Sequence, residues 1–218
     1  MSPIPRSGKT CSNLYARITL SSLNEVVGEH GMHVVFRMAG LPELADTLLP
    51  QDDQKEMDHA DLAAIFQTIE GIFGVHGARG IFMRAGQMTF NELRQHCCPA
   101  ELTNEINQPE VPVNEKVQDG LNALVQMLAQ HTDQHFDFEQ GREADTWQVV
   151  IHDCLECQGR QAEQPVCAFA EGILEQALFV FSGGSKFRVE ENHCAASGGE
   201  ACTFSIEVPA PENPPFKV

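Results

Sequence analysis

The distribution of cysteine is the feature that most constrains this chain. Eight cysteines occur in 218 residues, and five of them lie between Cys154 and Cys202. The first ten residues combine prolines and basic residues with no apolar stretch behind them, so we expect no secretory signal and a cytoplasmic location. In a reducing compartment cysteines remain thiols or metal ligands rather than disulfides. The clustering therefore predicts a metal site, with ordinary buried thiols as the alternative.

One set of metal ligands follows from the order of residues near the C-terminus. Glu191-x-x-Cys194 lies at the end of an expected strand, and a loop with two glycines can bring Cys202 back beside it. Cys167 is expected at the start of a neighbouring helix, where the helix dipole would lower its thiol pKa. Three sulfurs and one carboxylate suit zinc, and four protein ligands leave no open position. The expected site is therefore structural zinc held by Cys167, Glu191, Cys194 and Cys202.

A second pair, Cys154-x-x-Cys157, follows an expected strand. A redox pair requires an electropositive setting at a helix N-terminus, whereas Asp153 and Glu156 would raise the thiol pKa values. We therefore favour a second metal site, or an exchange of one of these thiols with Cys167 in the first site. Two bystander thiols, or a redox- or zinc-responsive pair, remain alternatives.

Charge and missing motifs exclude several function classes. The formal net charge is −17, with only 14 basic residues thinly spread, which disfavours nucleic acid and anionic membrane surfaces as partners. No stretch approaches the roughly 18 apolar residues of a membrane span. The chain lacks a dinucleotide fingerprint, a phosphate-binding loop and a nucleophile elbow. No catalytic residue can be named, so an enzymatic function is uncertain and a binding function is favoured.

Hydrophobic periodicity predicts an α+β fold. Helical patterns dominate the first 135 residues, and strand patterns with one further helix follow, which is typical of helices packed on an antiparallel sheet. We expect helices at 20–30, 58–73, 81–95, 113–131 and 168–181, and strands at 136–138, 147–151, 186–190 and 203–208.

Two further features bear on organisation and ligand binding. Residues 26–40 and 72–86 resemble each other at a constant offset of 46, which suggests two similar helix–turn–helix units without establishing a duplication. Trp147 is the only tryptophan and opens a strand close to the cysteines. Because its ring combines an apolar body with a polar N–H, we predict that it lines an apolar ligand pocket.

The C-terminal part contains four short motifs: Cys167-x-x-x-x-Gly172-Ile173-Leu174, Gly183-Gly184-x-x-Phe187-x-Val189, Glu191-x-x-Cys194-x-Ala196-x-Gly198 and Cys202-x-Phe204-x-Ile206. Together they resemble the vinyl-4-reductase (4-vinyl reductase) domain family of the hydrocarbon-binding type, over about residues 60–208 and most strongly over 145–208. The resemblance implies a fold like the TRAPP subunits, the ligand-binding type of NO signalling and Golgi transport, often as a homodimer.

The resemblance also implies a function. One group of family members forms the sensor domains of phenol- and xylene-responsive transcriptional activators, in which an apolar pocket binds an aromatic effector beside structural zinc. Carried over by motif, the zinc ligands are again Cys167, Glu191, Cys194 and Cys202, with Trp147 near the pocket. We therefore expect a non-enzymatic, zinc-stabilised binding protein for a small aromatic or hydrocarbon-like ligand. The alternative is an accessory or carrier protein in bacteriochlorophyll or tetrapyrrole biosynthesis.

The same reasoning divides the chain into three parts. Residues 1–57 are expected to form an N-terminal helical extension, 58–208 the vinyl-4-reductase-like domain and 209–218 a proline-rich tail.

Overall fold

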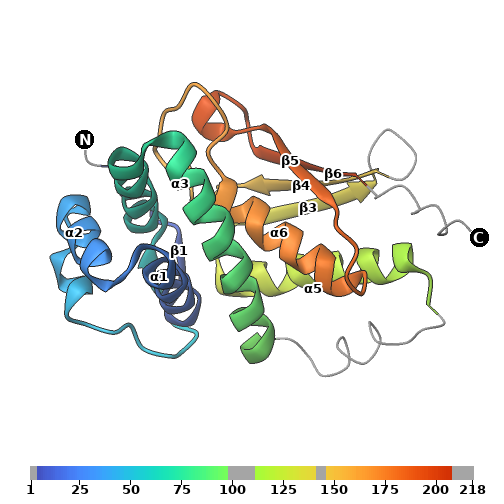
Figure 1. Cartoon of the computed structure of the whole chain (residues 1–218), viewed down its shortest axis with the longest axis horizontal. Coiled ribbons are helices and arrows are strands. Elements are labelled where there is room, and N and C mark those ends of the chain that lie inside the picture. Colours follow the sequence, from blue (N-terminus) through green and yellow to red (C-terminus); the bar gives the residue numbers. More distant parts are fainter. Residues whose placement is uncertain (1–3, 98–110, 141–145, 208–218) are drawn as a thin grey trace, which may run out of the picture.

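A four-stranded antiparallel sheet in the order β3-β4-β6-β5 forms the C-terminal part of the molecule (Figure 1). The structure is a computed structural model and describes residues 4–97, 111–140 and 146–207; the proline-rich tail lies outside these ranges. The strands are β3 (His135–Gln140), β4 (Thr146–His152), β5 (Arg188–His193) and β6 (Cys202–Glu207). The antiparallel arrangement and the four strand positions confirm the α+β prediction, with boundaries shifted by one to three residues.

Alternation of side chains gives this sheet one buried face. On β4, Trp147, Val149 and Ile151 are buried while the residues between them are partly exposed. Two helices cover the buried face, α5 (Val113–His131) and α6 (Ala168–Phe181), and both lie in front of the sheet in Figure 1. Their bounds coincide with the predicted ones, because each carries a clear apolar stripe of helical period.

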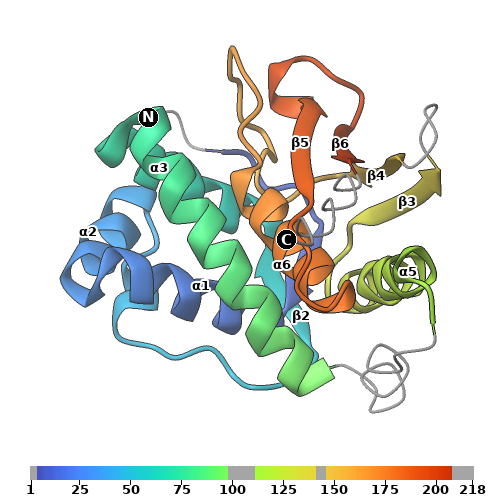
Figure 2. The ribbon, with the colours of Figure 1, turned by 45° about the vertical axis from the view of Figure 1, so that its right-hand side comes forward.

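The helix α3 (His59–Cys97) packs across α6 on the side away from the sheet (Figure 2). The two backbones touch where Gly86 meets Gly172, because a Cβ on either glycine would overlap a carbonyl oxygen of the other helix. Close by, the rings of Phe66 and Phe169 lie 5.3 Å apart. The helix α6 is therefore fixed between the sheet and α3.

The N-terminal part joins the same core. The short strand β1 (Thr10–Ser12) pairs with β2 (Lys55–Asp58), across the boundary predicted at residue 58. Between them come α1 (Asn13–Val27), α2 (Glu29–Ala39) and the 3-10 helix η1 (Pro42–Ala45). The apolar side chains of α1 and α3 belong to one continuous hydrophobic cluster with those of the sheet.

The two similar sequence segments share a backbone feature. Helix α1 gives way to α2 at Gly28 (φ 86°, ψ 149°), and α3 bends at Gly74 (φ 72°, ψ 162°), which lies 46 residues later. Such positive φ angles are available to glycine at little cost. Each segment therefore has a helix–glycine–helix geometry, and the helix expected at 81–95 is the second half of α3.

Within the described residues, no helix is both long enough and apolar enough to cross a lipid bilayer.

The contact between α3 and α6 leads to a prediction about stability. Gly172→Ala should lower the free energy of unfolding by about 2 kcal/mol or more, because the new methyl group would force two backbones apart. Gly80→Ala is the matched control, because nothing lies within 4 Å of that position and alanine favours the helix. Urea denaturation of both variants checks this, and equal stability of the two would contradict the close packing of α3 and α6.

Candidate metal centre and ligand cavity

The four ligands predicted from the sequence meet at one buried point. The donor atoms of Cys167, Glu191, Cys194 and Cys202 all lie within 4.8 Å of one another. The sulfur of Cys167 is 3.7 Å from that of Cys194 and 3.6 Å from that of Cys202. All four residues are buried, so convergence of the set is a property of the core and not of a surface loop.

A tight turn brings two of these cysteines together. After β5 the chain forms the 3-10 helix η2 (Ala195–Ser197), which ends at Gly198 with φ 97°. The turn places the sulfurs of Cys194 and Cys202 at 3.9 Å, and the Ala195 N–H donates to the Cys202 sulfur at 3.4 Å. An N–H directed at sulfur stabilises a thiolate, as expected of a metal ligand.

Glu191 is held in place by one oxygen and leaves the other without a partner. The Cys167 N–H donates to Glu191 Oε2 at 2.8 Å, whereas Oε1 is buried and has no hydrogen-bond partner among the described residues. Burial raises the pKa of Glu191 to about 8. A buried carboxylate oxygen without a donor is costly, and a cation at this point would satisfy it. The donor set, three sulfurs and one oxygen, fits zinc.

The pair Cys154 and Cys157 belongs to the same cluster. The Cys154 sulfur is 3.6 Å from that of Cys167, and the Cys157 sulfur is 3.4 Å from that of Cys202. These four cysteines form a second buried group that is compact enough to hold a metal ion. They therefore contact the first ligand set directly, which bystander thiols at a hairpin mouth would not do.

The expected effect of the α6 dipole on Cys167 is wrong. Burial raises the pKa of the Cys167 thiol well above its ordinary value. The first N–H groups of the helix are taken by carboxylates instead, because Glu156 accepts from Phe169 at 3.0 Å and from Ala170 at 2.7 Å. Glu156 is itself buried, which raises its pKa. Sequence reasoning treated Glu156 only as an unfavourable neighbour of the cysteines and missed this capping role.

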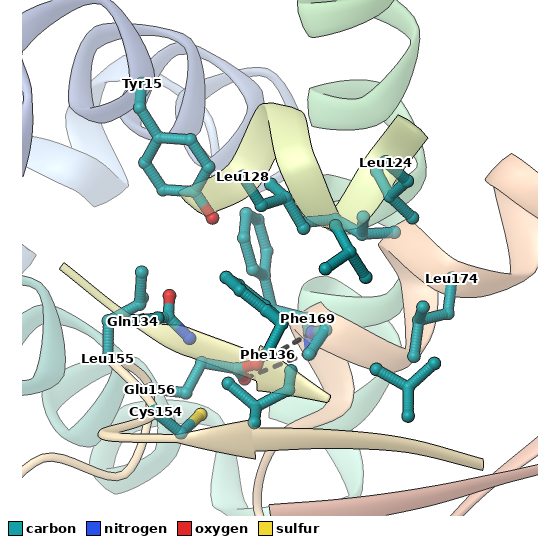
Figure 3. Close-up of a pocket in the computed structure, with 15 residues that line it drawn as sticks. Tyr15, Leu124, Leu128, Gln134, Phe136, Cys154, Leu155, Glu156, Phe169 and Leu174 are labelled. Carbon is teal, nitrogen blue, oxygen red and sulfur yellow. Dashed lines mark hydrogen bonds between the residues drawn. The ribbon is translucent and has the colours of Figure 1, made fainter. Parts of the chain in front are cut away.

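An apolar cavity adjoins the cluster, between the sheet, α1, α5 and α6 (Figure 3). It leaves about 30 Å³ for the centres of solvent-sized atoms, room for roughly two water molecules. The Tyr15 hydroxyl and the Gln134 side chain point into it in Figure 3, and Cys154 forms part of its wall. The remaining wall is mainly aliphatic and aromatic: Leu124, Val125, Leu128, Phe136, Val149, Ile151, Leu155, Phe169, Ala170, Ile173 and Leu174, with Glu156 at the edge.

Trp147 lies on the same face of β4 but does not line this cavity. Its ring packs against Phe187, with 6.3 Å between the ring centroids. The β4 residues in the cavity wall are Val149 and Ile151, the next inward-facing positions along the strand. A role of Trp147 in ligand contact therefore stays a prediction.

Comparison with known proteins places the C-terminal part in a family. The model of the 4-vinyl reductase domain matches residues 147–208, which confirms the resemblance for this segment. A comparison with curated proteins finds no match.

Solved structures share the fold over a longer span. An H-NOX protein from S. oneidensis in its Fe(II)NO ligation state is 17% identical, with a TM-score of 0.55 over 89% of this chain and 99% of that chain. An unliganded Fe(II) H-NOX protein from K. algicida is 12% identical, with a TM-score of 0.54 over 92% and 99%. The phenol-responsive sensory domain of the activator PoxR, with phenol, is 19% identical, with a TM-score of 0.50 over 70% and 76%.

The cavity does not fit the iron of the H-NOX structures. No histidine occurs among the described residues that line it, and the free space is close to two water molecules. Both oxygens of Glu156 are engaged by the backbone of α6.

The fold prediction is nevertheless confirmed, because H-NOX and the PoxR sensory domain share the α+β arrangement of helices on an antiparallel sheet. Residues 147–208 of this chain therefore form a 4-vinyl reductase domain, set within a larger fold of the kind seen in H-NOX proteins.

Proposed function

We propose that this protein is a metal-stabilised binding module for a small, neutral and mainly apolar molecule. The single observation that carries the proposal is a shared wall: Cys154 lines the apolar cavity, and its sulfur lies 3.6 Å from that of Cys167. The fold is shared with a domain described as phenol-responsive, which supports a sensory role without defining the ligand.

The cavity wall indicates the chemistry of the ligand. The Tyr15 hydroxyl and the Gln134 amide are the groups able to hydrogen-bond a ligand without requiring it to be charged, and the rest of the wall is largely hydrocarbon. A ligand with one hydroxyl or carbonyl on an apolar body matches this pattern. An aromatic ring is larger than the free space, so we expect side chains such as Leu128 to change rotamer on binding.

Zinc is the metal that we propose for the site made of Cys167, Glu191, Cys194 and Cys202. Thiolates and a carboxylate in a closed set of four suit a structural ion, which would tie the start of α6 to β5 and β6. No step of chemistry is assigned to it. Binding of zinc and association into a homodimer both stay predictions.

The tetrapyrrole alternative receives less support from the cavity. A macrocycle is far larger than the space available, so the helices α5 and α6 would have to separate from the sheet. An accessory role in tetrapyrrole biosynthesis therefore needs a second binding surface, and we retain the small-ligand proposal.

The role of Tyr15 can be tested with phenol and toluene as probes. Tyr15→Phe should weaken phenol binding about tenfold, the equivalent of one hydrogen bond, and leave toluene binding unchanged. Ligand-observed NMR and calorimetry on the full chain measure both affinities. Benzoate is the charged control and should not bind, because the wall offers its carboxylate no cation.

Failure of the unmodified chain to bind either phenol or toluene would contradict the proposed ligand class. An equal loss for both probes in Tyr15→Phe would show that the hydroxyl only shapes the cavity.

The metal can be tested by removal of one ligand. Cys194→Ala should abolish metal binding and lower the melting temperature strongly, because structural zinc contributes roughly 10 kcal/mol or more in small sites. Cys11→Ala is the matched control: Cys11 is equally buried, but lies on β1 outside the cluster, so this variant should keep its metal. Elemental analysis and thermal melting of both variants decide, and unchanged melting of Cys194→Ala would exclude a structural ion.

A further inference from the structure

The cluster contains two overlapping ligand sets. One set consists of Cys154, Cys157, Cys167 and Cys202, and the other replaces the first two by Glu191 and Cys194. The sets therefore share Cys167 and Cys202, whose sulfurs lie 3.6 Å apart.

The distances within the cluster match tetrahedral metal sites. Zinc bound by sulfur at about 2.3 Å places neighbouring ligand atoms about 3.8 Å apart. The contacts here are 3.6 Å from Cys154 to Cys167 and 3.4 Å from Cys157 to Cys202 in one set. In the other set they are 3.7 Å from Cys167 to Cys194 and 3.9 Å from Cys194 to Cys202. Two tetrahedra that share the edge from Cys167 to Cys202 satisfy these distances.

Charge also favours a second ion. When ionised, the five thiolates and Glu191 carry −6, so one divalent ion leaves −4 and two leave −2. All six residues are buried, and a buried charge without compensation is expensive. The buried Arg160 nearby donates to Glu70 at 2.6 Å and to the Glu156 carbonyl, and is engaged there.

The backbone around the second pair is shaped to bring it inward. Asp153 takes a φ of 54°, unusual for a residue other than glycine, at the point where β4 ends and the turn to Cys154 begins. Its carboxylate pairs with Lys9, from the segment that leads into β1. The backbone conformation thus turns the chain so that both sulfurs enter the cluster, where Cys154 and Cys157 are 3% and 5% exposed.

We propose that the cluster is a binuclear site for two soft divalent cations such as zinc, bridged by the thiolates of Cys167 and Cys202. Cys154 and Cys157 complete the coordination of one ion, and Glu191 and Cys194 that of the other. This inference rests on the metal site of the proposed function and extends it by one ion. The added ion lies next to the cavity wall, because Cys154 belongs to both.

The number of ions per chain tests the inference. The full chain, reduced and freed of metal, is titrated with Zn²⁺ and measured by native mass spectrometry. Two ions are expected. One ion would overturn the binuclear site and leave the single structural site intact, whereas none would overturn both. Binding that disappears at micromolar free Zn²⁺ would count as adventitious and would also overturn the proposal.

Two variants locate the second ion. The double variant Cys154→Ser with Cys157→Ser should bind one ion, and the control Cys11→Ser should bind two. Retention of two ions by the double variant would overturn the assignment.

The bridge itself has a magnetic signature that does not depend on a variant. Two Co²⁺ ions that share thiolates couple antiferromagnetically, so the magnetic moment per cobalt in the fully loaded chain should fall below that of the singly loaded chain. Equal moments at both loadings would show that the ions are not bridged and would overturn the proposal.

Discussion

Three buried carboxylates hold the start of α6 against its neighbours, and the site depends on them. Glu156 binds the N–H groups of the first helical turn, Glu191 binds the Cys167 N–H, and Glu171 accepts from the Glu191 N–H at 3.0 Å. A buried carboxylate is tolerated only where donors surround it, so each contact restrains the loop, the helix and the strand together. Arg79 pairs with Glu171 at 2.6 Å and links α3 to the same group.

This arrangement puts the cysteine cluster and the cavity on two sides of one loop. The segment around Cys154 provides a sulfur to the cluster and a surface to the cavity, and Glu156 in the same segment caps α6. A change of loop position on one side would be felt on the other, because interiors are close-packed and shift in discrete steps. That coupling is the physical basis for regarding the molecule as a sensor domain.

Much of the fold could be predicted because its elements carry strong local patterns. The helices α5 and α6 have regular apolar stripes, and their bounds were predicted without error. The strand β1 was not predicted, because three residues carry no periodicity and its partner β2 lies more than 40 residues away. Of the site, the sequence predicted the four ligands from Cys167 to Cys202, whereas the capping role of Glu156 depends on a helix that the chain reaches only after a turn.

The sequence by itself determined the class of fold, the closed ligand set and the 4-vinyl reductase segment, because these follow from residue type, spacing and period along the chain. Tertiary structure decided that Cys154 and Cys157 join the same cluster, that burial outweighs the helix dipole at Cys167, and that Val149 and Ile151 rather than Trp147 line the cavity. The physical reason is that burial and distance arise only when segments far apart along the chain pack together. The close contact of Gly86 with Gly172 is the clearest case, since neither glycine by its own surroundings in the sequence reveals the other.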